Sequence, residues 1–512
     1  MDVTTLMRKS VAINRDRPAV ITEQQTVSFA QAWDRGVRLA QGLLAMGVKK
    51  GERVACLGDN NLWCADECLG CAIAGAVRVP LYARNSRDSH RDMIEGTQCV
   101  ALLADAAHAA SLVGLDREMA SLRQVLVRDD GYEAWLQAQS AVDPMIAIDG
   151  DDWYVIRHSG GTTGAPKGVG YTHHDWVVNC RNWAYLLDRM SFNSAVGHAG
   201  PISHASGYLF LPVWLAGGSN VLFGAFEPAK VIRMMRRHGV SHMFASAPIL
   251  AALATQADAR SAPWPALRSL LAGGSPISDN TIAITRAAFG DVLYQAFGQT
   301  EAVPITGMGP DEWFAQVPGS TPLRSAGRVL PFAEVKICDE AGNELPVGQT
   351  GEIVAKVEGQ MRGYWNNHEL SQARLVDGWV HTNDVGRLDD NGYLYVLDRS
   401  DDKIVSGGFN IWPAELENVI AGHPGVIEVV VFAVPHDKWG ETPMAVVRVQ
   451  DLAALSEEQV VQMCRDHLGS YKKPTRVSIT LEPLPRSPVG KLLRRVLREP
   501  HWAGRETRVA GT

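Results

Sequence analysis

The chain has 512 residues, of which 46% are hydrophobic and 21% charged, and its net charge is −7 at pH 7. This composition is typical of a soluble globular protein, and the length predicts roughly two to four domains rather than one core. The negative charge excludes a general attraction to nucleic acid or to an anionic membrane surface. The mixed, polar N-terminal stretch 1–30 does not resemble a signal peptide, so we expect a cytoplasmic protein.

The first third of the chain alternates between helical and strand patterns. Apolar residues three or four apart predict helices at 29–46 and 62–76, and short apolar runs predict strands at 53–57, 77–81, 99–103 and 124–127. Such alternation predicts a parallel sheet with helices on both faces.

Three cysteines in the second predicted helix allow two interpretations. Cys64, Cys68 and Cys71 have the spacing of the iron–sulfur motif of radical SAM enzymes. The same three residues follow the period of an apolar helix, where free cysteine is a common small core residue. The helix interpretation is favoured, because ligands along one regular helix do not wrap a cluster easily. The remaining cysteines are scattered, which fits a reducing compartment.

A strand expected at 153–157 leads into a loop rich in glycine and hydroxyl side chains. Backbone N–H groups in such a loop can form an anion-binding nest, and a lysine beside them adds positive charge. The loop suits a polyphosphate, although its spacing is not that of a Walker A motif. A mobile surface loop between two strands is the alternative. The residues concerned are Ser159, Gly160, Gly161, Thr162, Thr163, Gly164 and Lys167.

The middle of the chain continues the alternation and adds candidate polar residues. The uncharged stretch 207–226 is broken by Pro212 and by a turn at 217–220, so it predicts a buried helix, a turn and a buried strand rather than a membrane span. His204 precedes this stretch and, taken alone, is typical of a structural histidine. Glu301 ends the segment 294–301, and it is either a surface charge or an oxygen ligand for Mg²⁺.

Short strands with Gly, Asn and Asp turns from about residue 328 predict a small β-barrel or sandwich. Asp384 there is either a turn former or an acceptor for a ribose diol. A polar break at 399–403 divides the chain into domains 1–398 and 399–512. The second domain has an α+β pattern and ends in a proline-stiffened loop that carries Lys491.

Taken in order, these strings resemble the acyl-adenylate-forming superfamily, which includes acyl- and aryl-CoA synthetases, peptide-synthetase adenylation domains and firefly luciferase. The resemblance spans about 25–495. The sequence departs from the family pattern at two places. It has Gly160-Gly161 where the family more often has one glycine after serine, and it has Gln299 in the magnesium motif. The matching elements are the phosphate loop 159–167, the magnesium-associated motif 297–301, the ribose residues Asp384 and Arg399, the hinge residue Asp401 and the lysine loop 485–491.

The resemblance implies an α/β fold: a large N-terminal domain of doubly wound sheets plus a small β-barrel, and a small mobile α+β C-terminal domain. It implies ATP, Mg²⁺ and coenzyme A as cofactors. The implied catalytic residues are Lys491, Glu301, Thr162 and Lys167, with Glu301 and Thr162 at the metal. The implied binding residues are Ser159, Gly160, Gly161, Thr163, Gly164, Gly274, Ser275, Pro276, Gln295, Ala296, Phe297, Thr300, Asp384, Arg399 and Gly408, and the acid pocket comprises His204, Gly207, Ala272 and Gly273.

The mechanism that the resemblance implies has two half-reactions. The carboxylate of the acid attacks the α-phosphate of ATP to give acyl-AMP and pyrophosphate, and a thiol then displaces AMP. Lys491 serves the first step, and rotation about Asp401 then removes it and brings Gly408 to the pantetheine tunnel.

Several functions share these motifs. No carboxylate lies near His204 to grip an ammonium group, which favours an apolar acyl or aryl acid over an amino acid. Free CoA is the expected acceptor, because no carrier domain follows. The alternatives are a stand-alone enzyme that loads a carrier protein, a luciferase-like oxygenase and a non-catalytic nucleotide-binding module. An iron–sulfur protein built on Cys64, Cys68 and Cys71 is an alternative from a different class. No nucleic acid or integral membrane partner is expected, and a homodimer is left open.

Overall fold

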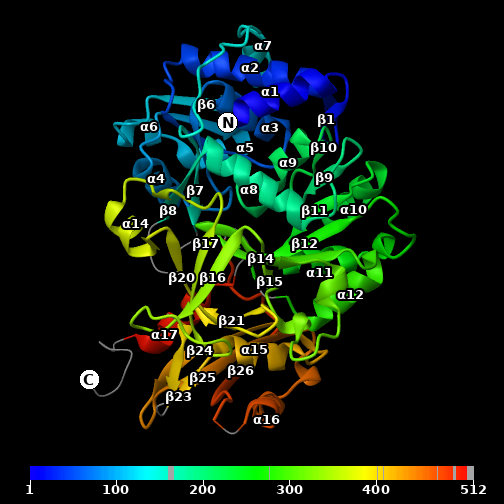
Figure 1. Cartoon of the computed structure of the whole chain (residues 1–512), viewed down its shortest axis with the longest axis vertical. Helices are drawn as coiled ribbons and strands as arrows, with labels where there is room; N and C mark the ends of the chain where they lie inside the picture. The colour runs from blue at the N-terminus through cyan, green and yellow to red at the C-terminus, as the bar shows by residue number, and fades with distance from the viewer. Residues whose placement is uncertain are drawn as a thin grey trace.

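The structure is a computed structural model that describes residues 1–159, 166–275, 277–399, 402–406, 409–469, 471–487 and 492–503. Four sheets organise it (Figure 1). Two large sheets form the upper part of the view, a small antiparallel sheet lies below them, and the sheet of the C-terminal region is at the bottom.

The first large sheet has seven strands and carries the strand predicted before the phosphate loop. Its strands from β7 to β6 run parallel, whereas β8 and β18 are antiparallel additions at one edge. Its order is β18 (Gly363–Tyr364), β8 (Lys167–Thr172), β7 (Trp153–Ser159), β4 (Val77–Pro80), β3 (Arg53–Leu57), β5 (Ala101–Asp105) and β6 (Gln124–Arg128).

The second large sheet has nine strands. Its central strands from β13 to β1 are parallel, whereas β2 at one edge and β14 and β15 at the other pair with their neighbours in antiparallel orientation. Its order is β15 (Arg328–Val329), β14 (Ala302–Met308), β13 (Leu293–Gln299), β12 (Ser269–Gly273), β11 (His242–Ala245), β9 (Ala195–His198), β10 (Ser219–Leu222), β1 (Pro18–Ile21) and β2 (Thr26–Ser28). Both sheets have the parallel cores with covering helices that the alternation predicted.

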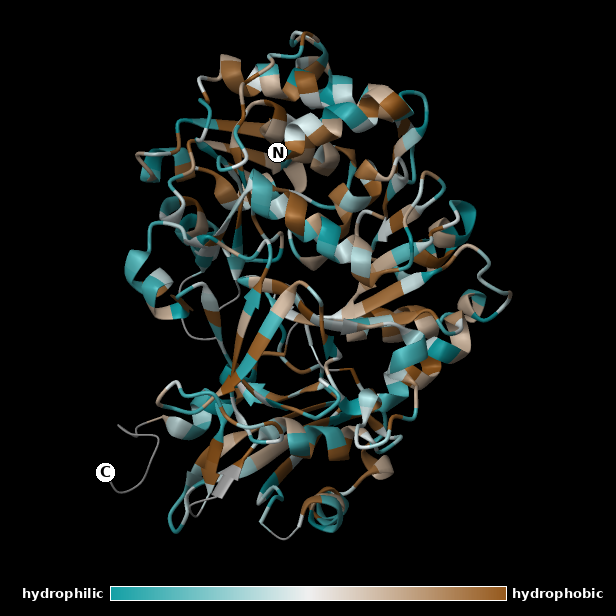
Figure 2. Cartoon of the chain, viewed as in Figure 1, coloured by the Kyte–Doolittle hydropathy of each residue, from teal (hydrophilic) through white to brown (hydrophobic). Residues whose placement is uncertain are grey.

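The helices of this part pack closely against the sheets and one another, and α8 lies between the two large sheets (Figure 1). They alternate between hydrophobic and hydrophilic residues along their length (Figure 2), as amphipathic helices do. They are α1 (Val3–Asn14), α2 (Phe29–Ala45), α3 (Leu62–Ile73), α4 (Arg87–Gly96), α5 (Ala106–Ala109), α6 (Leu115–Glu118), α7 (Tyr132–Gln137), α8 (His173–Leu186), α9 (Phe210–Leu215), α10 (Pro228–Arg237), α11 (Ala247–Ala254), α12 (Asp279–Phe289), α13 (Pro310–Trp313) and α14 (His368–Arg374).

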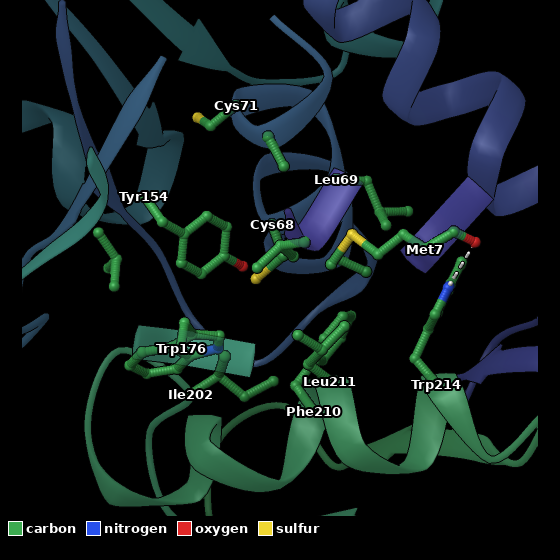
Figure 3. Close-up of a cluster of buried hydrophobic side chains, with 14 of the residues drawn as sticks. Met7, Cys68, Leu69, Cys71, Tyr154, Trp176, Ile202, Phe210, Leu211 and Trp214 are labelled. Carbon is green, nitrogen blue, oxygen red and sulfur yellow. Dashed lines mark hydrogen bonds between the residues drawn. The ribbon is translucent and has the colours of Figure 1, made fainter. Parts of the chain in front are cut away.

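The cysteine helix α3 is buried. It ends at Ile73, three residues before the predicted end, because Gly75 has a left-handed φ of 66° that starts the turn into β4. Cys64, Cys68 and Cys71 are at most 6% exposed, and Figure 3 shows Cys68 among the hydrophobic side chains of the core. Among the described residues, no three His, Cys, Asp or Glu side chains gather closely enough to hold a metal ion, which contradicts the iron–sulfur alternative. The three thiols are packing groups of the core.

The small third sheet is antiparallel and occupies the region for which a β-barrel or sandwich was expected. It contains β16 (Ala333–Cys338), β17 (Gly351–Val357), β20 (Trp379–Leu388), β19 (Leu375–Val376) and β21 (Leu394–Arg399), with β21 paired to β20. The fourth sheet contains β23 (Phe409–Ile411), β22 (Ile404–Ser406), β25 (Gly440–Val449), β24 (Val426–His436) and β26 (Arg476–Thr480). The helices α15 (Pro413–Ala421), α16 (Glu457–Leu468) and α17 (Arg494–Trp502) accompany it, which gives the predicted α+β pattern.

The uncharged stretch folds as predicted into a buried helix, a turn and a strand. A 3₁₀ turn (Ala205–Leu209) runs into α9, and Gly217 turns the chain into β10 with a φ of 78°. Among the helices that the structure describes, none combines the length and apolar character that crossing a bilayer requires.

Candidate active site

The predicted phosphate loop joins the ends of two paired strands. Ser159 is the last residue of β7, Lys167 is the first of β8, and the two face each other in the antiparallel ladder. The loop therefore leaves the carboxyl end of β7, the edge at which α/β sheets bind ligands. Gly160, Gly161, Thr162, Thr163 and Gly164 lie outside the described residues.

Glu301 is a buried carboxylate and not a surface charge. It is 5% exposed, and its Oε1 accepts a hydrogen bond of 2.9 Å from the hydroxyl of Tyr364 on β18. The backbone carbonyl of the preceding Thr300 accepts another from the hydroxyl of Tyr171 on β8. Two strands of the phosphate-loop sheet thus hold the Thr300-Glu301 segment in place, which connects two motifs far apart in the sequence.

The donor set around Glu301 fits a magnesium ion shared with a ligand. Mg²⁺ in phosphate-handling sites is held by one or two carboxylates together with phosphate oxygens and water. Glu301 accepts from a neutral hydrogen-bond donor and forms no ion pair with a residue that the structure describes, so its carboxylate is available to a bound cation. That part of the chain contains no cluster of three or more His, Cys, Asp or Glu side chains able to hold a metal ion.

Asp384 lies within β20 and is not a turn former. It is 7% exposed, and its Oδ2 accepts a hydrogen bond of 2.7 Å from Nε2 of Gln299. The same Gln299 nitrogen donates to the carbonyl of Thr382 at 2.7 Å. Gln299, a departure from the family pattern, therefore links the magnesium motif to the predicted ribose aspartate. Arg399 ends β21 and pairs with Asp384 in the backbone ladder.

The strands β12 and β13 bring most of the remaining nucleotide and pocket residues to one sheet edge. Ala272 pairs with Gln295, and Gly273 pairs with Ala296, on neighbouring parallel strands. A Cβ at Gly273 would lie 3.1 Å from the Ala296 carbonyl, so a side chain there would crowd the neighbouring strand. Gly274 follows with a φ of 80° and open space beside it, Ser275 is exposed, and Pro276 lies outside the described residues.

Gln295 and Phe297 also have defined structural contacts. Nε2 of Gln295 donates to the carbonyl of Ser325 at 2.6 Å, which anchors β13 to the chain before β15. Phe297 packs against the main hydrophobic core and against the core of the small third sheet. The implied binding residues Gln295 and Phe297 therefore lie on a strand that contacts the chain on both sides.

His204 and Gly207 lie at the start of the 3₁₀ turn. The His204 ring meets the Tyr82 ring edge to face, with centroids 5.5 Å apart. A Cβ at Gly207 would lie 2.1 Å from the Ile202 carbonyl, so no other residue fits there without a backbone shift. Gly207 is therefore required for the shape of the turn as well as being a predicted pocket residue.

Arg157 is a site residue that the sequence reasoning missed. It lies on β7, is 2% exposed, and places its guanidinium 4.1 Å from the ring centroid of Tyr208 and 5.5 Å from that of Trp176. Its Nε and Nη2 have no hydrogen-bond partner in the described part of the chain. The available signal was a charged residue inside an otherwise apolar strand, two positions before Ser159.

The buried groups around Arg157 are uncharged at neutral pH. Burial raises the pKa of Tyr82, Tyr171 and Tyr208, and it lowers the pKa of His158 to about 3. The phosphate-loop strand is thus surrounded by neutral aromatic groups, with Arg157 as a buried cation.

Lys491, Asp401 and Gly408 lie outside the described residues, but the ends of the lysine loop are described. Arg486 and Leu492 form an isolated antiparallel bridge, and the N–H of Leu493 donates to the carbonyl of Pro485 at 2.8 Å. Nε of Arg486 donates to Glu428 Oε1 on β24 at 3.1 Å. The loop is therefore closed at its base and fixed to the C-terminal sheet.

Comparison with known proteins gives a consistent family. Residues 7–365 match the family model described as AMP-binding enzyme, and 415–491 match AMP-binding enzyme C-terminal domain. A feruloyl-CoA synthase from Amycolatopsis sp. is 34% identical, with 91% of this chain and 92% of the relative covered. The long-chain-fatty-acid–CoA ligase FadD13 of Mycobacterium tuberculosis is 32% identical, with 93% of each covered.

A third relative and a solved structure extend this picture. The fatty acid–[acyl-carrier-protein] ligase ScoC of Streptomyces coeruleorubidus is 30% identical, with 95% of this chain and 93% of the relative covered. The crystal structure of ATP-bound MatB from Rhodopseudomonas palustris has a TM-score of 0.88 and 26% identity, with 98% of this chain and 99% of that chain covered. The chain therefore belongs to the AMP-binding enzyme family, in the acyl-adenylate-forming superfamily that its motifs resemble.

Proposed function

We propose that this enzyme joins an apolar carboxylic acid to coenzyme A through an acyl-AMP intermediate, with ATP converted to AMP and pyrophosphate. It is an AMP-forming acid–thiol ligase. The observation that carries the assignment is the contact set between the phosphate-loop sheet and the magnesium motif: Tyr171 binds Thr300 and Tyr364 binds Glu301. It supports a polyphosphate and a metal-binding carboxylate at one place.

Each residue group then has a role in the first half-reaction. The phosphate loop with Thr162, Thr163 and Lys167 binds the β- and γ-phosphates, and Asp384 with Arg399 holds the ribose. Glu301 and Thr162 hold Mg²⁺, which when bound neutralises phosphate charge. Lys491 lies between the acid carboxylate and the α-phosphate. One such contact at ~4 Å in an effective dielectric near 20 contributes about 4 kcal/mol before desolvation.

The second half-reaction requires the C-terminal domain to move. The thiol must reach the carbonyl that Lys491 covered, so we propose two domains, 1–398 and 399–512, that rotate about Asp401. The closed, anchored base of the lysine loop supports this, since a loop fixed to its own sheet moves with that sheet. Gly408 then admits the pantetheine of CoA.

The acid is apolar in this proposal. The pocket residues Ala272, Gly273 and Gly207 have little or no side chain, and His204 lies against the aromatic ring of Tyr82. The relatives act, by their names, on ferulate and on long-chain fatty acids, so both aryl and acyl chains belong in the test. A homodimer remains a prediction that analytical ultracentrifugation can test.

A pyrophosphate-release screen against aryl and acyl acids, with and without CoA, tests the assignment. We expect acid-dependent pyrophosphate release that CoA accelerates, because the thiol frees the enzyme of acyl-AMP. Absence of acid-dependent release across the panel would contradict the proposal.

Loading of a carrier protein is the second candidate, because one relative is named a fatty acid–[acyl-carrier-protein] ligase. In that case a holo-carrier protein, and not free CoA, would release AMP from the adenylated enzyme. The same screen with a holo-carrier protein in place of CoA separates the two acceptors.

A further inference from the structure

One arginine binds carboxylates from both sides of the proposed hinge. Arg494 begins α17, three residues after Lys491. Its Nη1 donates to Asp402 Oδ2 at 2.6 Å and to Asp398 Oδ1 at 3.2 Å, and its Nη2 donates to Glu417 Oε1 at 2.9 Å. The Arg494 side chain is 19% exposed and that of Asp398 is 6% exposed, so this cluster is largely shielded from water.

The three carboxylates differ in the part of the chain to which they belong. Asp398 lies on β21, where it pairs with Val385 of β20 in the small third sheet. Asp402 and Glu417 follow position 401, as Arg494 does, and so belong to the C-terminal domain of the proposed function. Of these three carboxylates, Asp398 is the one whose contact with Arg494 joins the two proposed domains.

Asp398 holds the C-terminal domain at a second point. Its Oδ2 accepts a hydrogen bond of 3.1 Å from the backbone N–H of Ala414, in the first turn of α15. The helix N-terminus carries a partial positive charge and unpaired N–H groups, which favour a carboxylate there. Both oxygens of Asp398 therefore bind groups of the C-terminal domain.

The charges of this cluster compensate one another, so breaking a contact within it costs free energy. Burial by itself would lower the pKa of Arg494, but Glu417, Asp398 and Asp402 hold it well above its ordinary value. Removing one partner of a largely buried ion pair is destabilising, because the other charge loses its compensation. Asp402 and Glu417 keep Arg494 compensated when Asp398 leaves, which makes separation at Asp398 feasible.

We infer that Asp398 is a positioning residue, which holds the C-terminal domain in the orientation used for acyl-AMP formation by binding Arg494 and the start of α15. This inference rests on the proposed function. The superposition on ATP-bound MatB over 98% of this chain supports assigning the present orientation to the ATP-consuming step. Rotation about Asp401 then separates Asp398 from Arg494. Asp402 and Glu417 stay bound to Arg494 and move with the C-terminal domain.

The test compares Asp398→Asn with the matched variant Asp402→Asn. Both remove one negative charge from the Arg494 guanidinium, but only the first removes it across the hinge. Asp402 also pairs with Arg498 at 3.3 Å, and that contact lies within the C-terminal domain. Each variant is measured for single-turnover acyl-AMP formation and, separately, for thioester formation from supplied acyl-AMP and CoA. Thermal unfolding of both variants reports any loss of folding.

We expect Asp398→Asn to lower the rate of acyl-AMP formation about three- to tenfold relative to thioester formation, the effect of a shift of about 1 kcal/mol in the orientation equilibrium. Asp402→Asn should leave the ratio of the two rates at the wild-type value. Equal ratios in both variants, or the shift in Asp402→Asn alone, would overturn the inference.

Small-angle X-ray scattering of the free enzyme gives a readout that does not depend on activity. The scattering profile should change for Asp398→Asn and match the wild type for Asp402→Asn; an unchanged profile in both contradicts the inference. If wild-type enzyme forms no acyl-AMP with any acid, the proposed function fails. If it is active and the ratio of the two half-reactions does not move, the inference alone fails.

Discussion

The two sides of the proposed active site are built from different kinds of contact. On the nucleotide side, Glu301 is 5% exposed and accepts a hydrogen bond from a neutral donor, the hydroxyl of Tyr364. On the C-terminal side, the contacts to the rest of the chain include an ion pair, between Arg494 and Asp398. Neutral donors orient a carboxylate without cancelling its charge, whereas ion pairs can exchange partners. The first side is suited to binding and the second to movement.

The largest expected effect comes from removing Lys491, the cation that we propose to act between the two sides. Lys491→Ala should lower acyl-AMP formation by ~10²–10³, the usual cost of losing a well-aimed transition-state donor. Rapid-quench measurement of acyl-AMP checks this. Thioester formation from supplied acyl-AMP serves as the control and should change little. An equal loss of acyl-AMP formation and thioester formation would contradict the proposed role of Lys491.

Restricting the proposed hinge should impair one half-reaction and spare the other. Asp401→Pro restricts the backbone φ at the proposed pivot, so we expect near wild-type acyl-AMP formation and a strongly lowered rate of thioester formation, because that step needs the domain movement. The same two assays measure it. Equal loss of both half-reactions would argue against position 401 as the pivot.

The neutral donors of the nucleotide side can be tested with a matched pair. Glu301→Gln keeps an acceptor for Tyr364 but removes the charge, and should lower acyl-AMP formation about 10²-fold with a raised Mg²⁺ requirement. Tyr364→Phe keeps the charge and loses one hydrogen bond, so a decrease of about tenfold or less is expected. Titration of Mg²⁺ in both variants measures this; a larger defect in Tyr364→Phe would reverse the assigned roles.

A smaller effect concerns the packing of α3 against α2 and its contribution to stability. A Cβ at Gly70 of α3 would lie 2.8 Å from Leu39 of α2, so Gly70→Ala should destabilise the fold by about 1–3 kcal/mol. Gly96, at the end of α4, has nothing within 4 Å of such a Cβ, and Gly96→Ala should change stability by less than about 1 kcal/mol. Chemical denaturation compares them, and equal stability would contradict the close packing of α2 and α3.

A further effect on stability is its dependence on acid. Burial lowers the pKa of His158 to about 3 and those of His173 and His198 to about 4. The unfolded chain binds these protons below pH ~6.5 and the folded chain does not, so stability is lost as the pH falls through that value. Each histidine contributes about 1.4 kcal/mol per pH unit. Denaturation midpoints that stay equal at pH 7.5 and 5.5 would contradict their burial in the neutral form.

Local patterns predicted the elements well where turn and capping signals bound them. The strand at 53–57 has the predicted bounds, and the helix expected at 29–46 is Phe29–Ala45, begun by the Ser28 capping box. In α8, Thr172 and Asp175 form a capping box, which fixes the start of the helix at His173. The strand expected at 99–103 is Ala101–Asp105, since an unbroken apolar run does not specify where a strand starts.

The site was predictable as a set of motifs but not as a set of contacts. No local pattern joins Tyr364 to Glu301 or Gln299 to Asp384, because these pairs are 63 and 85 residues apart and meet only through the sheet arrangement. Arg157 was missed for the same reason: its aromatic partners lie on α8 and in the 3₁₀ turn. Sequence reasoning identifies chemistry-bearing residues, and the packing of the sheets decides which of them meet.

The most direct test follows the oxygen atoms of the acid. With an accepted acid whose carboxylate carries ¹⁸O on both oxygens, complete turnover with ATP and CoA should leave one ¹⁸O in AMP and none in pyrophosphate. This result is expected because a carboxylate oxygen attacks the α-phosphate and remains there when the thiol displaces AMP. Mass spectrometry that finds AMP without the label would contradict activation of the acid as an acyl-adenylate.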